Sequence, residues 1–199
     1  MKKEENYGIL ASIDWNSNKW QDNPTSEDLS QSKFGNVIKT GKTFTSLNFA
    51  HKKFPNLDGY YPALLPQLWK KTPDKEKSKK VIIIFIKSYN WHDKQNYLIG
   101  YYAFPIFKRE SINSPLDSTL MDINIRSQVK DIYLLNNSIN LSKHIDLNKF
   151  LPVGKDLGKQ GYNYLTKDNV LKIMDSIRKV NQNIPELEGV MLRILKFLK

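Results

Sequence analysis

The apolar run VIIIFI at residues 81–86 most constrains how this chain can fold. It is short, rich in β-branched residues and bounded by polar residues, which is typical of a strand buried in a sheet. A second strand-like segment at residues 97–107 follows after a polar segment at 88–96. We therefore predict a hairpin with a long loop, formed by strands at 81–87 and 97–107, at the centre of a sheet.

Further strands are predicted on both sides of this hairpin, with a loop at 111–118. Pro62 and Pro66 confine one of them, residues 60–65, to a sheet edge or a bulge, because proline has no backbone N–H to donate to a neighbouring strand. The remaining predicted strands are residues 7–13, 34–39, 44–49, 122–126 and 131–135.

Helix-start signals occur mainly at the end of the chain. Thr25 or Ser26 can cap a short early helix, Thr166 can cap a longer one, and Pro185 suits the first position of a third. Apolar residues recur at helical spacing after Thr166 and after Pro185. Because strands come first and helices last, we predict an α+β fold with a curved, mostly antiparallel sheet.

Composition excludes several kinds of site. The 199 residues include no cysteine, so disulfides, zinc–thiolate sites and cysteine nucleophiles are excluded. His51, His92 and His144 lack metal-ligand spacing, and we expect neither a metal nor a cofactor. No apolar run approaches the roughly 20 residues of a membrane helix, and residues 1–10 lack a signal-peptide pattern. We expect a cytoplasmic protein with no membrane partner.

The net charge of +11 and the isoelectric point of about 9.6 favour an anionic partner, and nucleic acid is the commonest. Lysine greatly outnumbers arginine, which also fits the coding bias of AT-rich genomes. The charge is therefore compatible with nucleic-acid binding without requiring it.

Enzyme motifs are absent from the sequence. There is no GxxxxGK[ST] phosphate loop and no G-x-S-x-G elbow. Asp74 and Glu76 flank Lys75 in a charged loop, which is a poor place for rigid metal ligands. We predict no catalytic activity, and a small nuclease with an unrecognised acidic site remains the alternative.

Four aromatic residues stand in polar segments directly after apolar strands: Trp15, Trp20, Tyr89 and Trp91. If the strand at 9–13 lies beside the strand at 81–87 in a parallel sense, both segments open at the same end of the sheet. Aromatic faces beside asparagine amides suit a planar heterocycle, such as a base taken out of its stack. The alternative is that each tryptophan caps the end of the sheet, with its indole N–H bonded to a carbonyl.

The order of several segments resembles the DNA-binding N-terminal domains of McrB-type modification-dependent restriction systems from archaea, which belong to the EVE/YTH/PUA-like superfamily. The resemblance covers most of the chain, to about residue 174. The segments that carry it are SIDWNSNKW, FGNVIKTG, SLNF, DGYYPALLP, VIIIFIKSYNW, YLIGYYAF and LGKQGYNYLTKDNVLKIM.

This resemblance implies a curved, barrel-like domain flanked by helices, which we place at residues 1–165. Helices at 166–199 would pack on it or lead to a motor domain. Such domains flip a modified base, often a methylated adenine or cytosine, into an aromatic cage. The implied partners are double-stranded DNA with a modified base and GTP-driven motor or nuclease subunits. An RNA-binding module of the same superfamily is the alternative.

The resemblance also implies a set of base-binding residues. Trp15 or Trp20 would form one wall of the cage, and Asn16 or Asn18 would read an edge of the base. The full implied set is Trp15, Asn16, Trp20, Asn48, Phe49, Ser88, Tyr89 and Trp91.

Overall fold

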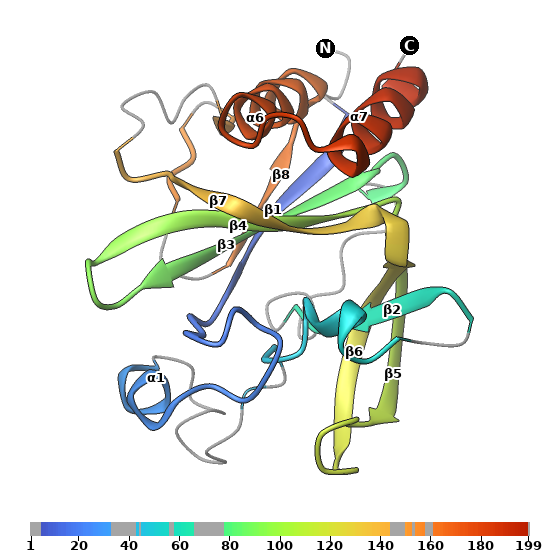
Figure 1. The fold of residues 1–199 in the computed structure, drawn as a ribbon. Helices are drawn as coiled ribbons and strands as arrows, with labels where there is room; N and C mark the ends of the chain where they lie inside the picture. Colours follow the sequence, from blue (N-terminus) through green and yellow to red (C-terminus); the bar gives the residue numbers. More distant parts are fainter. Residues whose placement is uncertain are drawn as a thin grey trace.

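The structure is a computed structural model that describes residues 5–32, 43, 45–55, 58–65, 78–143, 150–152, 154–157 and 161–198. The described strands form two sheets (Figure 1). The larger contains, in order, β7 (Ile132–Asn140), β4 (Gln95–Ala103), β3 (Ile83–Asn90), β1 (Gly8–Ile13) and β8 (Tyr162–Leu165). The smaller contains β2 (Tyr60–Ala63), β6 (Leu120–Gln128) and β5 (Ile106–Asn113).

The helices are α1 (Ser26–Gln31), α6 (Lys167–Val180) and α7 (Pro185–Leu198), with short 3₁₀ helices η1 (Ala50–Lys52) and η2 (Val129–Asp131). Thr25 and Thr166 cap α1 and α6 through capping boxes, and Pro185 begins α7, as predicted. No helix within the described residues is long and apolar enough to cross a membrane.

The predicted α+β class and mostly antiparallel pairing are confirmed. β1 runs parallel to β3, and the other strand pairs in the described part of the chain are antiparallel. β3 is the middle strand of its sheet, which confirms the predicted central hairpin. β2, which contains Pro62, lies at a sheet edge, as the missing N–H of proline requires.

The larger sheet is buried on both faces. Alternate residues of β1 point to opposite sides, so Leu10 packs in the cluster beneath α6 and α7, whereas Ile9 and Ala11 pack in the cluster that includes η1 and the smaller sheet. Figure 1 shows the two helices over one face and the smaller sheet beyond the other. Burial of one leucine or isoleucine side chain stabilises the fold by about 1.5–3 kcal/mol. Packing on both faces therefore holds the larger sheet in place.

The strand predicted at 44–49 is wrong. Residues 45–49 form turns that lead into η1, and Phe44 lies outside the described residues. The Asn48 Nδ2 donates to the Leu64 carbonyl at 2.9 Å, and its Oδ1 accepts from the Leu64 N–H at 3.1 Å. The amide side chain thus takes the place of a strand neighbour, a local competition typical of asparagine. The strand predicted at 34–39 lies outside the described residues.

Several predicted boundaries also differ from the structure. The loop predicted at 88–96 is a turn at 91–94, because β3 continues to Asn90 and β4 starts at Gln95. The strand predicted at 97–107 breaks into β4 and β5 at Phe104, which has a φ of 49°, and at Pro105, which has no N–H. The loop predicted at 111–118 starts late, because β5 extends to Asn113.

Candidate functional site

The parallel pairing of β1 with β3 brings two turns to the same end of the sheet. Ile13 stands opposite Ser88, and the Ser88 hydroxyl donates to the Ile13 carbonyl at 3.0 Å. The chain continues from β1 into the first turn, residues 14–25, and from β3 into the second turn, residues 91–94. This placement is the one on which the prediction of a shared aromatic pocket depended.

A buried carboxylate ties the two turns together. Asp28 is 3% exposed and accepts hydrogen bonds from the Ser17 N–H at 3.0 Å and the Ser17 hydroxyl at 2.9 Å. It also accepts from the Thr25 N–H at 3.0 Å and from the Trp91 indole N–H at 3.2 Å. Burial raises the pKa of this carboxyl, but the bonds from Ser17 and Thr25 outweigh burial and leave the pKa below its usual value.

The first turn uses much of its polar surface internally. The Trp20 side chain is 4% exposed, and its indole N–H donates to the Asp14 carbonyl at 2.7 Å, the geometry expected of an end-capping tryptophan. Asn16 is buried, donates to the Asp22 carbonyl at 2.9 Å and accepts from the Asn18 N–H at 2.7 Å. The Asn16 amide therefore holds the turn in shape.

Trp15 is the half-buried member of an aromatic cluster. Its ring meets Trp20 edge to face, with centroids 5.5 Å apart, and lies 6.1 Å from Tyr97. Trp20 contacts Phe49, which packs directly on the backbone of Gly100, where an added Cβ would lie 2.6 Å from the Phe49 Cζ. The cluster therefore fixes the Trp15 ring from behind while part of it stays accessible.

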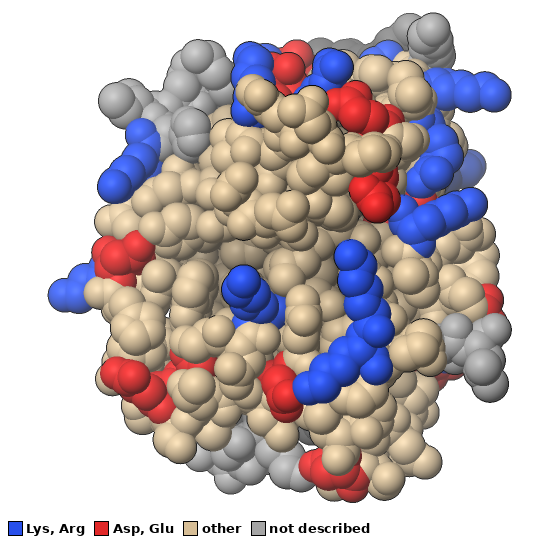
Figure 2. Space-filling model, in the orientation of Figure 1, with Lys and Arg blue, Asp and Glu red and all other residues tan. Residues whose placement is uncertain are grey.

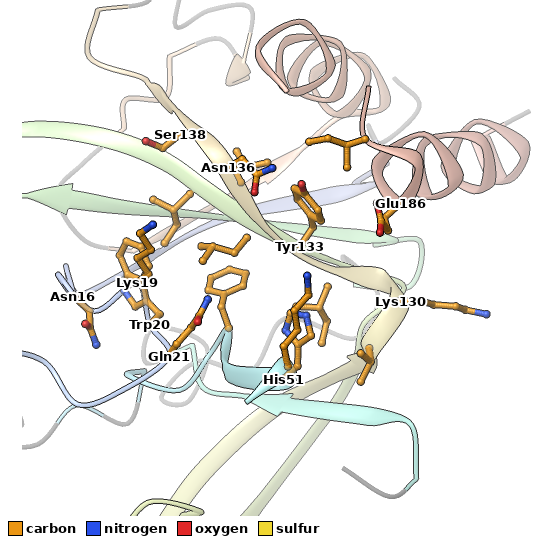
Figure 3. Close-up of a pocket in the computed structure, with 18 of the residues that line it drawn as sticks. Asn16, Lys19, Trp20, Gln21, His51, Lys130, Tyr133, Asn136, Ser138 and Glu186 are labelled. Atoms are coloured by element: carbon orange, nitrogen blue, oxygen red, sulfur yellow. The ribbon is translucent and has the colours of Figure 1, made fainter. Parts of the chain in front are cut away.

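This cluster opens on a groove of about 1010 Å³ that runs beside β7 (Figure 3). One wall is the first turn with η1, and the other is β7 with the segment that leads into α7. The volume lies at the upper end of the range for ligand pockets, about 300–1,000 Å³. The polar and aromatic residues that line it are Trp15, Asn16, Ser17, Lys19, Trp20, Gln21, Phe49, His51, Lys52, Lys130, Tyr133, Asn136, Ser138, Asn183 and Glu186.

The charged residues of the groove are mainly basic. Lys19 and Lys52 are exposed and form no ion pair with any other residue that the structure describes. Lys130 also lines the groove, but Figure 3 shows its ammonium end pointing outward. Figure 2 shows lysine and arginine side chains projecting beside a hollow near the middle of this face. Among the lining residues that the structure describes, Glu186 is the one that is acidic.

His51 lines the groove as a neutral ring. It is 6% exposed, and burial together with the charge of Lys52 lowers its pKa to about 4. Its Nδ1 is buried without a hydrogen-bond partner among the described residues, and so is the indole N–H of Trp15. These two nitrogens are buried beneath the groove surface, so they are unsatisfied atoms of its wall rather than groups exposed to a ligand.

The sequence-predicted site residues fall into two groups. Trp15, Asn16, Trp20 and Phe49 line the groove. Asn48, Ser88, Tyr89 and Trp91 do not line it. The Trp91 ring stacks on His92, with centroids 3.4 Å apart, and faces Asp28 rather than the groove.

Sequence reasoning missed the wall formed by β7. The predicted strand at 131–135 stops before Asn136 and Ser138, which line the groove. The available signal is the polar run at 136–138 between the apolar residues Leu135 and Ile139. Bulges are over-represented at sheet edges and next to binding sites, and this run falls in one.

No group of three or more histidine, aspartate or glutamate side chains in the described ranges could hold a metal ion. Comparisons with protein-family models, with curated proteins and with solved structures gave no match.

Proposed function

We propose that this protein is a non-catalytic, cytoplasmic reader of double-stranded DNA that takes a modified, methylated base into the groove beside β7. The observation that carries the proposal is Trp15, a half-buried ring braced by Trp20 and Tyr97 on the wall of a groove flanked by lysines. A base leaves its stack at a cost of a few kcal/mol, and an aromatic wall returns about 1–3 kcal/mol by stacking.

The charge of the protein supports a polyanionic ligand. The net charge is +11, and the exposed Lys19 and Lys52 stand at the groove without acidic partners in the described part of the chain. These lysines would contact phosphates on either side of the flipped nucleotide. Phosphate contacts position the duplex, whereas the base in the groove supplies the specificity.

The resemblance of the sequence to McrB-type N-terminal domains is a second support. Under this proposal the two sheets form the curved, barrel-like body of an EVE/YTH/PUA-like domain. The chain then acts as the targeting module of a restriction system, and the GTP-driven motor and the nuclease reside in other domains or subunits.

The experiment that tests the proposal measures dissociation constants by fluorescence anisotropy. The probes are identical DNA duplexes with a central adenine, N6-methyladenine, cytosine or 5-methylcytosine, and matching RNA duplexes. We expect tighter binding of one methylated DNA duplex, and a loss of about one to two decades in its affinity for Trp15→Ala. Trp15→Phe, which keeps a flat ring, should retain most of the affinity.

Repeating the same titrations at several salt concentrations tests the predicted phosphate contacts of the lysines. Each lysine that contacts a phosphate contributes roughly 0.9 to the slope of log affinity against log salt concentration. Lys19→Gln and Lys52→Gln should each lower this slope and leave the ratio of methylated to unmethylated affinity unchanged. Lys94→Gln, in the second turn and outside the groove, is the matched control. Equal affinity for every probe, or binding only to RNA, would contradict the proposal.

A further inference from the structure

β7 carries a large bulge beside the groove. Its pairing with β4 passes from Leu98–Ile139 directly to Gly100–Leu134. Ile99 alone therefore stands opposite residues 135–138, which we call the β7 bulge. Bulges redirect side chains at sheet edges and beside binding sites. Because β7 is an edge strand, this bulge can project without disturbing a further neighbour.

The middle of the β7 bulge is held by a buried amide. Asn181, at the C-terminal end of α6, is 2% exposed. Its Oδ1 accepts from the Asn137 N–H at 2.9 Å, and its Nδ2 donates to the Asn137 carbonyl at 3.0 Å. The Asn137 side chain donates to the Val180 carbonyl at 3.2 Å. One side chain thus replaces a strand neighbour and fixes the backbone of the bulge.

This attachment decides which side chains face the groove. Side chains alternate along extended backbone, so Asn137 turns toward α6 while Asn136 and Ser138 turn the other way. Both line the groove, and Asn137 does not. Figure 3 shows Asn136 and Ser138 on the β7 wall, across from the turn that carries Trp20. Their side chains are exposed and have no hydrogen-bond partner among the residues described in this structure.

Unlike Asn136, the asparagines Asn16 and Asn18 of the first turn already form hydrogen bonds within the protein. The Asn16 amide is engaged at both ends within the turn, and Asn18 donates to the Asn23 carbonyl at 2.6 Å. Turning either amide toward a ligand would break bonds that shape the turn. Asn136 and Ser138 can bond a ligand by exchanging only water.

We infer that the β7 bulge is the wall that reads the hydrogen-bonding edge of the base, and that Asn181 is its positioning residue. This inference rests on the proposed function, in which Trp15 supplies the stacking face. Asn136 offers an amide donor and an acceptor side by side, and Ser138 offers a hydroxyl that can do either. A base edge presents the same kinds of groups, and a bidentate pair changes discrimination by roughly 5- to 100-fold.

The test measures base selectivity, defined as the dissociation constant of the weakest-binding probe divided by that of the tightest-binding probe. The probes are fluorescent DNA duplexes that differ only in one central, mispaired nucleotide: A, C, G, T, N6-methyladenine or 5-methylcytosine. We expect Asn136→Ala to reduce the selectivity of the wild type at least about fivefold, while the weakest probe binds within about twofold of its wild-type constant. Ser138→Ala should reduce selectivity less.

Asn113→Ala is the matched control, because it removes an exposed asparagine amide at the end of β5, outside the groove and its walls. It should leave the selectivity ratio unchanged. Asn181→Ala should lower selectivity. Its melting transition is measured by circular dichroism, and binding is measured well below that transition so that the variant is folded. Asn181→Asp should lower selectivity as well, because a carboxylate oxygen replaces the Nδ2 that donates to the Asn137 carbonyl.

The outcomes separate this inference from the proposed function. If the wild type binds DNA selectively and Asn136→Ala with Ser138→Ala leaves the ratio unchanged, the inference is wrong and the groove proposal stands. Binding without any base selectivity also overturns the inference. If the wild type binds no nucleic acid, both proposals are wrong.

Discussion

The two turns at the end of the larger sheet start from adjacent parallel strands, yet they place their tryptophans differently. The first turn folds back over the sheet and brings Trp20 against Phe49, with Trp15 against Trp20 at the groove. The second turn is a tight reversal at the tip of the β3–β4 hairpin, and Trp91 lies on its outer side against His92 and Asp28. Neighbouring strand ends therefore do not guarantee neighbouring side chains.

The difference follows from how far each strand continues. β1 ends at Ile13, directly above the buried cluster, so the long first turn can cover it. β3 continues past Ser88 to Asn90, which carries the second turn beyond the groove. Asp28 is the point where the turns meet, because it accepts from Ser17 of the first and Trp91 of the second.

The largest effect on stability should come from removing Trp20, the buried tryptophan of the first turn. Trp20→Ala should lower the free energy of unfolding by about 3–5 kcal/mol, because a fully buried aromatic side chain is lost and a cavity remains. Urea denaturation followed by circular dichroism measures it. Trp20→Phe keeps a ring but removes the indole N–H that bonds the Asp14 carbonyl and part of the ring volume, and it should cost less, about 1–3 kcal/mol. A loss below 1 kcal/mol for Trp20→Ala would mean that the ring is not part of the core.

Asp28→Asn should loosen both turns at once. The variant keeps one oxygen acceptor where the carboxylate receives four hydrogen bonds, so we expect a loss of roughly 2–3 kcal/mol. The folded-state pKa of Asp28 is lowered, so its contribution is present above the unfolded value, about 3.9, and is lost as pH falls through the folded pKa. Urea titrations at pH 7 and pH 3 check this: a deficit of equal size at both values would contradict it.

The sequence predicted the strands better than the site, for a physical reason. A run such as VIIIFI can lower its free energy only by burial, so its place in the sheet follows from local composition. The prediction of a shared pocket required β1 and β3 to be parallel neighbours, and the two strands do pair in parallel. Whether a side chain at that end faces a ligand depends on partners distant in sequence, which local patterns do not contain.

Two asparagines make this concrete. Asn16 follows Trp15 in the first turn and Asn136 follows Leu135 in β7, and the sequence favours Asn16 because Trp15 and Trp20 stand on either side of it. In the structure the Asn16 amide is engaged by Asp22 and Asn18, whereas Asn136 faces the groove because Asn181 fixes the backbone beside it. The bond from Asn181 joins residues 44 positions apart, so no local pattern could reveal it.

A smaller effect on stability is expected at Asp14, which follows β1 in the first turn. Burial raises the pKa of Asp14 to about 7, although a bond from the Ser32 hydroxyl lowers it. A carboxyl whose folded pKa is raised contributes stability below its unfolded value, about 3.9, and that contribution disappears as pH rises through 7. Asp14→Asn should therefore be more stable than the wild type at pH 8 by about 1–2 kcal/mol, with no gain at pH 4. Melting curves at both pH values measure the difference, and a gain at pH 4 would contradict the assignment.

The smallest effect should come from the second turn, and it tests the comparison most directly. Trp91 makes one hydrogen bond, to an Asp28 carboxylate that has three other donors, and its ring stacks on an exposed histidine. Trp91→Ala should therefore cost about 1 kcal/mol or less in the free energy of unfolding. Its affinity for methylated DNA should stay within about twofold of the wild type, because the ring does not line the groove, whereas Trp15→Ala loses at least about tenfold. Anisotropy titrations of the two variants on the same methylated duplex make the comparison. A tenfold loss for Trp91→Ala would mean that both turns wall one pocket, as the sequence predicts, and that the second turn moves toward the groove when DNA binds.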